Sequence, residues 1–147
     1  MPKLYLDNCC FNRPFDDQTQ LRVRLETEAK LFIQRQIQEG RIEIFWSAVL
    51  DFEIKRSPFK ARQETFDIFR RLSQTIVDID DEIRRSSLAF QKRGLTWVDA
   101  LHVACAVKAG CDYFITVDKR IINKAITEIN ILNPIQFIQF HEKDFSS

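Results

Sequence analysis

Glycine is scarce in this sequence, with three residues among 147, where average usage of about 7% would give about ten. A Gly-rich phosphate-binding loop needs more glycine than this, and neither GxGxxG nor the P-loop pattern GxxxxGKS/T occurs. The scarcity argues against dinucleotide-binding and P-loop NTPase chemistry. Because each glycine follows a segment of helical periodicity, we expect Gly40, Gly94 and Gly110 to end helices as left-handed residues.

Metal-binding cysteine patterns and long apolar runs are also missing. The four cysteines form no CxxC pair, and two histidines cannot complete a structural zinc set. We therefore expect reduced thiols and an intracellular protein. The first ten residues contain no apolar signal core, and no apolar run approaches the ~18 residues of a membrane span. We expect a cytoplasmic protein that does not enter membranes.

Net charge is nearly absent, since 22 Lys and Arg residues face 21 Asp and Glu residues and leave +1. This balance excludes a histone-like polycation and an acidic tail. It does not exclude local groups of one sign: residues 55–71 hold six basic and two acidic side chains. A charge run is usually a solvated face, but nucleic-acid grooves need this kind of patch beside their chemistry. No RNP-like aromatic motif occurs, so base stacking is not predicted.

The apolar pattern predicts strands alternating with helices along one domain over residues 1–147. Expected strands are the short β-branched and aromatic runs at 4–6, 42–46, 75–79, 113–116 and 129–132. A helix is expected over 17–38, with Leu21, Leu25, Ala29, Phe32, Ile33 and Ile37 on its buried stripe. A second, central helix is expected over 98–109, with a buried face that includes Lys108. The pattern is that of an α/β protein with a mostly parallel sheet covered on both faces.

Acidic residues follow the predicted strands. Asp7 and Asp118 come directly after two of them, Glu53 lies on a helix that Ser47 caps, and Asp99 opens the central helix. Ligand sites of open parallel sheets gather beyond the carboxyl ends of the strands. We therefore expect these four carboxylates to converge.

Each acid also has an ordinary structural explanation. Thr96 and Asp99 fit the S/T-x-x-D/E capping box, and Asp118 can cap the helix that begins at Lys119. Asp7 can close a turn after its strand, and Glu53 can pair with Arg56 or Arg41. The set is less easily explained, because clustered carboxylates repel one another unless a cation joins them. Oxygen-only ligation favours Mg²⁺ or Mn²⁺, and such ions catalyse phosphodiester hydrolysis.

These motifs resemble the PIN domain, a metal-dependent ribonuclease fold that includes VapC toxins of bacterial toxin–antitoxin pairs. The resemblance covers nearly the whole chain and rests on residues 4–8 (LYLDN), 47–53 (SAVLDFE), 99–104 (DALHVA) and 115–118 (ITVD). It implies a three-layer α/β/α sandwich with a mostly parallel central sheet. Residues 8–17 look like a subgroup of the family rather than the best-studied toxins.

The resemblance places the family's acidic metal site on Asp7, Glu53, Asp99 and Asp118. Asp51 is a competing second acid, although the helical register from Ser47 favours Glu53, because the two side chains cannot face the same way. Supporting positions beside the acids are Thr116 and Asn8. Candidate substrate-binding residues are Lys55, Arg56, Lys60 and Lys119.

The implied function is an endoribonuclease that uses Mg²⁺ or Mn²⁺, acts as a toxin, binds a small antitoxin and forms a homodimer. A catalytically silent nucleic-acid-binding module and a small-substrate phosphatase remain alternatives. Two smaller features are interpreted as structural rather than functional. His102 is either a packed helix residue or a partner of the nearby Asp99, and packing is favoured. Cys9 and Cys10 are interpreted as small buried side chains rather than a redox pair.

Overall fold

The computed structural model describes residues 1–12, 18–58, 60–124 and 126–145. The N-terminal half contains β1 (Lys3–Leu6), α1 (Cys9–Asn12), α2 (Leu21–Gln38), β2 (Glu43–Ile44), β3 (Trp46–Ser47), α3 (Ala48–Lys55) and α4 (Lys60–Leu72). The C-terminal half contains β4 (Ile76–Val77), α5 (Asp81–Lys92), α6 (Trp97–Lys108), β5 (Tyr113–Ile115), α7 (Lys119–Ile122), β6 (Asn130–Leu132) and α8 (Pro134–Phe145).

The main sheet has four strands in the order β2-β1-β5-β6, and all of its pairs are parallel. All five predicted apolar runs contain strands, although the run at 42–46 divides between β2 and β3. β3 pairs with β4 in a separate two-stranded parallel sheet. The α/β class and the parallel sheet predicted from the sequence are confirmed.

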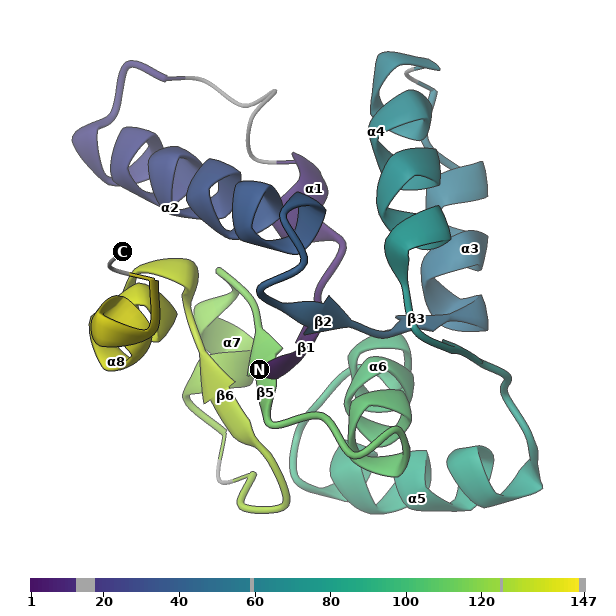
Figure 1. Cartoon of the computed structure of the whole chain (residues 1–147). Coiled ribbons are helices and arrows are strands. Elements are labelled where there is room, and N and C mark those ends of the chain that lie inside the picture. The colour runs from purple at the N-terminus through teal and green to yellow at the C-terminus, as the bar shows by residue number, and fades with distance from the viewer. Residues whose placement is uncertain (13–17, 59, 125, 146–147) are drawn as a thin grey trace.

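Helices cover both faces of the main sheet, so the fold is a three-layer sandwich. In Figure 1, α2 and α8 lie on one side of the sheet, and α5 and α6 lie on the other. α3 and α4 stand together beyond β3. The central strands β1 and β5 are the most buried, with Leu4, Tyr5, Phe114 and Ile115 fully enclosed. Within the described residues, no helix combines the length and apolar character that crossing a membrane requires.

The capping residues and the glycines at the helix ends adopt the conformations that the sequence predicts. The side chains of Ser47 and Thr96 accept hydrogen bonds from the backbone N–H groups of Leu50 and Asp99, and so cap α3 and α6. Gly40, Gly94 and Gly110 all have positive φ. At Gly110 the angle is +75° with no atom near a Cβ position, so the backbone conformation alone selects glycine there.

The predicted buried stripe of α2 is partly wrong. The helix begins at Leu21, and Asp17, the predicted start, lies outside the described residues. Leu21 and Leu25 are exposed, whereas Lys30 is buried because its Nζ donates a 2.8 Å hydrogen bond to the Cys9 carbonyl. The predicted stripe thus turns toward solvent at Leu21 and Leu25, while Val23 is the buried apolar residue of the first turn, and a buried ammonium group takes an interior position further along the helix.

The prediction that Lys108 lies on the buried face of the central helix α6 is wrong. Its side chain is exposed, and its Nζ lies 2.9 Å from Asp80 Oδ2 and 2.7 Å from Glu82 Oε2. The Lys108 side chain thus faces the start of α5 rather than the core, although Cys105 and Ala106 in the same turn are buried. His102, in the middle of α6, is fully buried. All four cysteines are free thiols, as expected.

Candidate functional site

The carboxyl ends of β1 and β5 place Asp7 beside Thr116. The parallel register pairs Leu6 with Ile115, and the Asp7 N–H extends the ladder with a 2.9 Å hydrogen bond to the Ile115 carbonyl. Asp7 is 7% exposed and Thr116 is fully buried. Strand pairing therefore carries a carboxylate and a hydroxyl to the same edge of the sheet, where ligand sites of parallel sheets lie.

The Asp7 carboxylate is held through both of its oxygens. Oδ1 accepts a 2.8 Å hydrogen bond from the Asn8 N–H, and Oδ2 accepts one of 2.8 Å from the Thr116 hydroxyl. The Thr116 oxygen also accepts from the Asp118 N–H at 3.1 Å. Asn8 and Thr116, the two supporting positions implied by the resemblance, thus both contact Asp7, Asn8 doing so through its backbone.

Cys9 lies at this same edge and was not expected there. Its Sγ is 3.6 Å from Asp7 Oδ2 and 3.5 Å from Thr116 Oγ1. A hydrogen bond with Cys10, burial and the Asp7 charge together raise the pKa of the Cys9 thiol well above its ordinary range. These effects favour the neutral thiol. Cys9 is half-buried, whereas Cys10 is buried as predicted.

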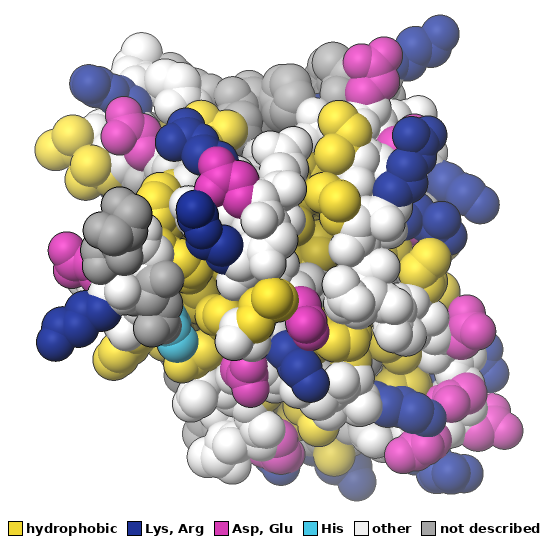
Figure 2. Space-filling model, in the orientation of Figure 1, with side chains coloured by type: hydrophobic (Ala, Val, Ile, Leu, Met, Phe, Trp, Pro, Cys, Tyr) yellow, Lys and Arg dark blue, Asp and Glu magenta, His cyan; other side chains and the backbone are white. Residues whose placement is uncertain are grey.

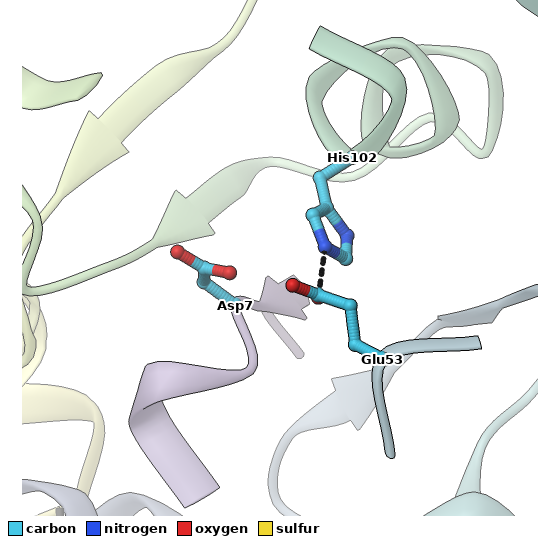
Figure 3. Close-up of side chains that lie close together, drawn as sticks. All are labelled: Asp7, Glu53 and His102. Atoms are coloured by element: carbon cyan, nitrogen blue, oxygen red, sulfur yellow. Dashed lines mark hydrogen bonds and ion pairs between the residues drawn. The ribbon is translucent and has the colours of Figure 1, made fainter. Parts of the chain in front are cut away.

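Glu53 projects from α3 toward Asp7, as Figure 3 shows. Its Oε1 lies 2.5 Å from His102 Nε2, and its side chain is 26% exposed. Arg56 and Arg41, the partners considered from the sequence, do not fill this role; Arg41 pairs with Glu39 instead.

Asp51, the competing acid on α3, faces away from Asp7. Its Oδ1 accepts hydrogen bonds from Trp46 Nε1 at 2.8 Å and from Arg70 Nε at 2.9 Å, and its Oδ2 accepts from Arg70 Nη2 at 3.2 Å. Asp51 thus joins α3 to α4. The helical register counted from Ser47 selected the acid that faces Asp7.

His102 is both buried and polar in its contacts. Its Nε2 contacts Glu53, and its Nδ1 lies 2.6 Å from the Tyr5 hydroxyl. Burial lowers the pKa of His102, but the hydrogen bond to Glu53 and the charges of Asp7, Glu53 and Asp99 outweigh it and raise the pKa above its ordinary value. His102 is buried, as the packing interpretation predicts, but its contact with Glu53 is a feature that the sequence did not reveal.

Asp7, Glu53 and His102 form a close group. One ligand atom from each lies within 4.8 Å of the others, and the side chains converge from β1, α3 and α6 (Figure 3). Two carboxylates with several oxygens, one buried and one partly open to solvent, are a donor set that suits a hard divalent cation.

Asp99 lies next to this group but outside the 4.8 Å set. It is half-buried at the first turn of α6, where its N–H bonds to Thr96 Oγ1. Burial and, to a smaller extent, the charges of Asp7 and Asp118 raise the pKa of Asp99. Asp99 therefore lies in the first turn that Thr96 caps, and it also shares an electrostatic neighbourhood with two of the other three predicted acids.

Asp118 has the capping role and an additional ion pair. Its Oδ1 accepts from the Arg120 N–H at 2.9 Å, and its two oxygens contact Arg120 Nε at 3.1 Å and Nη2 at 2.9 Å. The Arg120 side chain thereby lowers the pKa of Asp118. Like Asp99, Asp118 stands outside the close group, so the structure brings two of the four predicted acids into direct proximity.

The four candidate substrate-binding cations lie on or next to α3, α4 and α7. Lys55 and Arg56 follow Glu53 on α3, Lys60 opens α4, and Lys119 follows Asp118; all four are exposed. The Arg56 guanidinium stands over the Phe52 ring, 5.2 Å from its centroid. Figure 2 shows Lys and Arg side chains gathered over α3 and α4.

Comparison with models of protein families shows to which family the chain belongs. A model of the PIN domain matches residues 5–126, a range that includes all four predicted acids. The chain belongs to the PIN domain family. This PIN domain matches no curated protein sequence.

Solved structures agree on the fold. A crystal structure of FitAcB from Neisseria gonorrhoeae superposes with a TM-score of 0.58 at 14% identity, covering 90% of this chain and 98% of the other. VapBC2 from Rickettsia felis, bound to a DNA fragment from its promoter, gives a TM-score of 0.54 at 14% identity, with 89% and 98% covered. FitAB bound to an IR36 DNA fragment gives 0.53 at 16% identity, with 89% and 94% covered.

Proposed function

We propose that this PIN domain is a divalent-metal-dependent endoribonuclease that hydrolyses RNA phosphodiester bonds. The observation that carries the proposal is the convergence of the Asp7 and Glu53 carboxylates at the carboxyl end of the sheet, 4.8 Å or less apart. Membership of the PIN domain family supports it. The exposed basic side chains over α3 and α4 supply the positive surface that a polyanionic substrate requires.

We assign the metal to Asp7 and Glu53, with Asp99 and Asp118 completing the site, and we propose Mg²⁺ or Mn²⁺ because all four donors are carboxylates. When bound, such an ion acidifies water and offsets the negative charge that develops on the phosphate. The chain's own groups orient the acids: the Thr116 hydroxyl and the Asn8 N–H hold Asp7, and His102 contacts Glu53.

Substrate binding falls to the exposed cations near the acids. We assign phosphate contacts to Lys55, Arg56, Lys60 and Lys119. Because such contacts release counterions from the nucleic acid, RNA affinity should fall as salt rises. Replacing any one of them should weaken RNA binding and leave metal affinity unchanged.

The proposal is tested by cleavage of single-stranded and hairpin RNA with Mg²⁺ or Mn²⁺. Asp7→Asn and Glu53→Gln should abolish cleavage, Asp99→Asn and Asp118→Asn should reduce it strongly, and EDTA should stop it. Asp51→Asn is the matched control, because this acid lies two residues from Glu53 but faces Trp46 and Arg70. Cleavage that persists in Asp7→Asn and in EDTA would refute the assignment. A small phosphoester offered in competition separates a nuclease from a phosphatase.

We further propose that the chain is the toxin of a toxin–antitoxin pair and works in the cytoplasm. The structural neighbours FitAcB, VapBC2 and FitAB support this role through their fold, and two of the three structures contain DNA. Expression should arrest growth, and co-expression of a neighbouring short reading frame should relieve the arrest. Arrest that Asp7→Asn leaves unchanged would contradict a toxic nuclease.

Residues 1–147 are proposed to fold as one unit and to form a homodimer. One cooperative unfolding transition, together with twice the chain mass in light scattering, is the expected result. Two separate transitions or a monomer at micromolar concentration would contradict it.

A catalytically silent nucleic-acid-binding module is the second candidate. The observation that favours it is the position of Asp99 and Asp118 outside the close group, with Asp118 already paired to Arg120. Calorimetric titration with Mn²⁺ separates the two candidates. Absence of binding at millimolar Mn²⁺, with RNA binding retained, would establish the silent module.

A further inference from the structure

A buried chain of polar side chains leads from the core to Glu53. The Tyr5 hydroxyl lies 2.6 Å from Ser47 Oγ and 2.6 Å from His102 Nδ1, and His102 Nε2 lies 2.5 Å from Glu53 Oε1. Tyr5, Ser47 and His102 are each 0% exposed. We name Ser47, Tyr5, His102 and Glu53 the buried polar chain.

We infer that Tyr5 and His102 are positioning residues that fix the Glu53 carboxylate relative to Asp7. The inference rests on the proposed function, because it assigns to Glu53 a place in the metal site. It extends that proposal by making metal affinity depend on two side chains that do not themselves hold the metal.

Strand geometry explains how one strand positions both acids. Tyr5 and Asp7 are two residues apart in and just after β1, so their side chains leave the same face. Asp7 reaches the site directly, and Tyr5 reaches Glu53 through His102. The distance between the two carboxylates is therefore set from β1 and not by α3 alone.

Both ends of helix α3 contribute a residue to the buried polar chain. Ser47, its N-cap, contacts Tyr5, and Glu53, near its C-terminus, contacts His102. Asp51 on the same helix has no part in this attachment, because it binds Trp46 and Arg70. The two contacts with the buried polar chain orient α3 so that Glu53, and not Asp51, faces Asp7.

Ring packing leaves Tyr5 little freedom to move. Its ring stacks on Phe114 with centroids 5.4 Å apart and meets His102 edge-on at 5.6 Å. Its hydroxyl carries one proton and so donates to one neighbour and accepts from the other. Burial requires a polar partner for each ring nitrogen of His102, and one of these partners is the Glu53 carboxylate at the site.

The test compares two conservative replacements of His102. The amide of a Gln side chain reaches the place of Nε2 and can still bond to Glu53, while that of Asn reaches only the place of Nδ1 and Tyr5. We expect His102→Asn to weaken Mn²⁺ binding about 10-fold, as loss of a ligand-orienting partner typically does, and His102→Gln to restore most of the affinity. Tyr5→Phe, which removes one oxygen atom, should also weaken Mn²⁺ binding.

The chain offers a matched control pair at the opposite end of the sheet. His141 Nε2 lies 2.8 Å from the Tyr113 hydroxyl, at the start of β5. Tyr113→Phe and His141→Asn delete the same kind of contact far from the acids and should leave Mn²⁺ affinity unchanged. Thermal melting of each variant confirms folding, and Tyr5→Phe carries the test if His102→Asn does not fold.

A double-mutant cycle separates positioning from general destabilisation. In a Glu53→Gln background, His102→Asn should cause no further loss of Mn²⁺ affinity, because His102 acts on the metal only through the Glu53 carboxylate. A full additional 10-fold loss there, or wild-type affinity in both folded His102→Asn and Tyr5→Phe, would overturn the inference.

A metal-free measurement distinguishes failure of this inference from failure of the proposed function. If the wild type does not bind Mn²⁺, the metal site is wrong, and the ¹⁵N NMR signals of His102 in the metal-free protein decide the inference. Glu53→Gln and Tyr5→Phe should shift both ring nitrogens of His102, and Asp51→Asn should not. Unshifted signals in Glu53→Gln would show that His102 does not hold this carboxylate.

Discussion

The Thr116 hydroxyl donates a 2.8 Å hydrogen bond to the Asp7 carboxylate across the ends of two neighbouring strands. The same oxygen accepts from the Asp118 N–H at 3.1 Å. One buried hydroxyl thus connects the acid after β1 to the acid after β5. The small polar residue that the family resemblance marked at this position has a physical role in holding Asp7.

Replacing Thr116 with Val should remove this support while keeping the side-chain shape. The buried Asp7 oxygen then loses a donor, which costs about 1–3 kcal/mol of unfolding free energy. Chemical denaturation measures the loss, and Mn²⁺ titration should show weaker binding. Thr116→Ser keeps the hydroxyl and is the control; equal stability and affinity of Val and Ser variants would contradict this role for the hydroxyl.

Replacing Arg120 with Gln should strengthen Mn²⁺ binding, because Arg120 occupies both oxygens of Asp118. The gain should be no more than about fivefold, since the Arg120 side chain is 80% exposed and the ion pair is screened by solvent. Lys119→Gln removes the same charge one residue away and should leave the Mn²⁺ affinity unchanged. Identical changes in the two variants would mean that only net charge matters, and would count against Asp118 as a ligand.

Replacing Asp51 with Ala should destabilise the fold without changing the chemistry of the folded protein. The buried Trp46 N–H loses its acceptor, at a cost of about 1–3 kcal/mol. Denaturation followed by tryptophan fluorescence measures the cost, and cleavage per folded molecule should equal that of the wild type. A stable but inactive Asp51→Ala variant would contradict this expectation and would indicate that Asp51 is a metal ligand.

Stability in acid should depend on Glu128. Its hydrogen bond from Arg93 is the main cause that lowers its pKa from 4.5 to about 2. A carboxyl with a depressed pKa stabilises the fold above its unfolded pKa, and the stabilisation disappears as pH falls from 4.5 through about 2. Glu128→Gln should therefore lose stability at pH 7 and show a shallower decline between pH 4.5 and 2. Parallel pH–stability curves for Glu128→Gln and wild type would exclude this contribution.

The sequence was most informative where one local rule decides the structure. Apolar β-branched runs located the strands, and Ser47 and Thr96 located the starts of two helices. Counting from Ser47 also selected Glu53 over Asp51, because a helix separates side chains two positions apart by about 200°. Each of these inferences needed only residues within one helix or one strand.

The sequence was least informative about polar groups inside the core. Periodicity could not show that Lys30 is buried against the Cys9 carbonyl, or that Tyr5 and His102 meet across 97 positions. Such contacts depend on which elements become neighbours after folding. The convergence of the acids was predictable only at the level of the sheet edge, since the family pattern does not fix how close Asp99 and Asp118 come to Asp7.

The order β2-β1-β5-β6 makes the acidic site a late product of synthesis. Asp7 leaves the ribosome well before its partner Thr116, which lies 109 positions further along the chain. Closing so long a loop is slow and has to wait until β5 is available to pair with β1. A nascent chain that has not yet reached β5 therefore carries Asp7 and Glu53 without the strand that completes their arrangement.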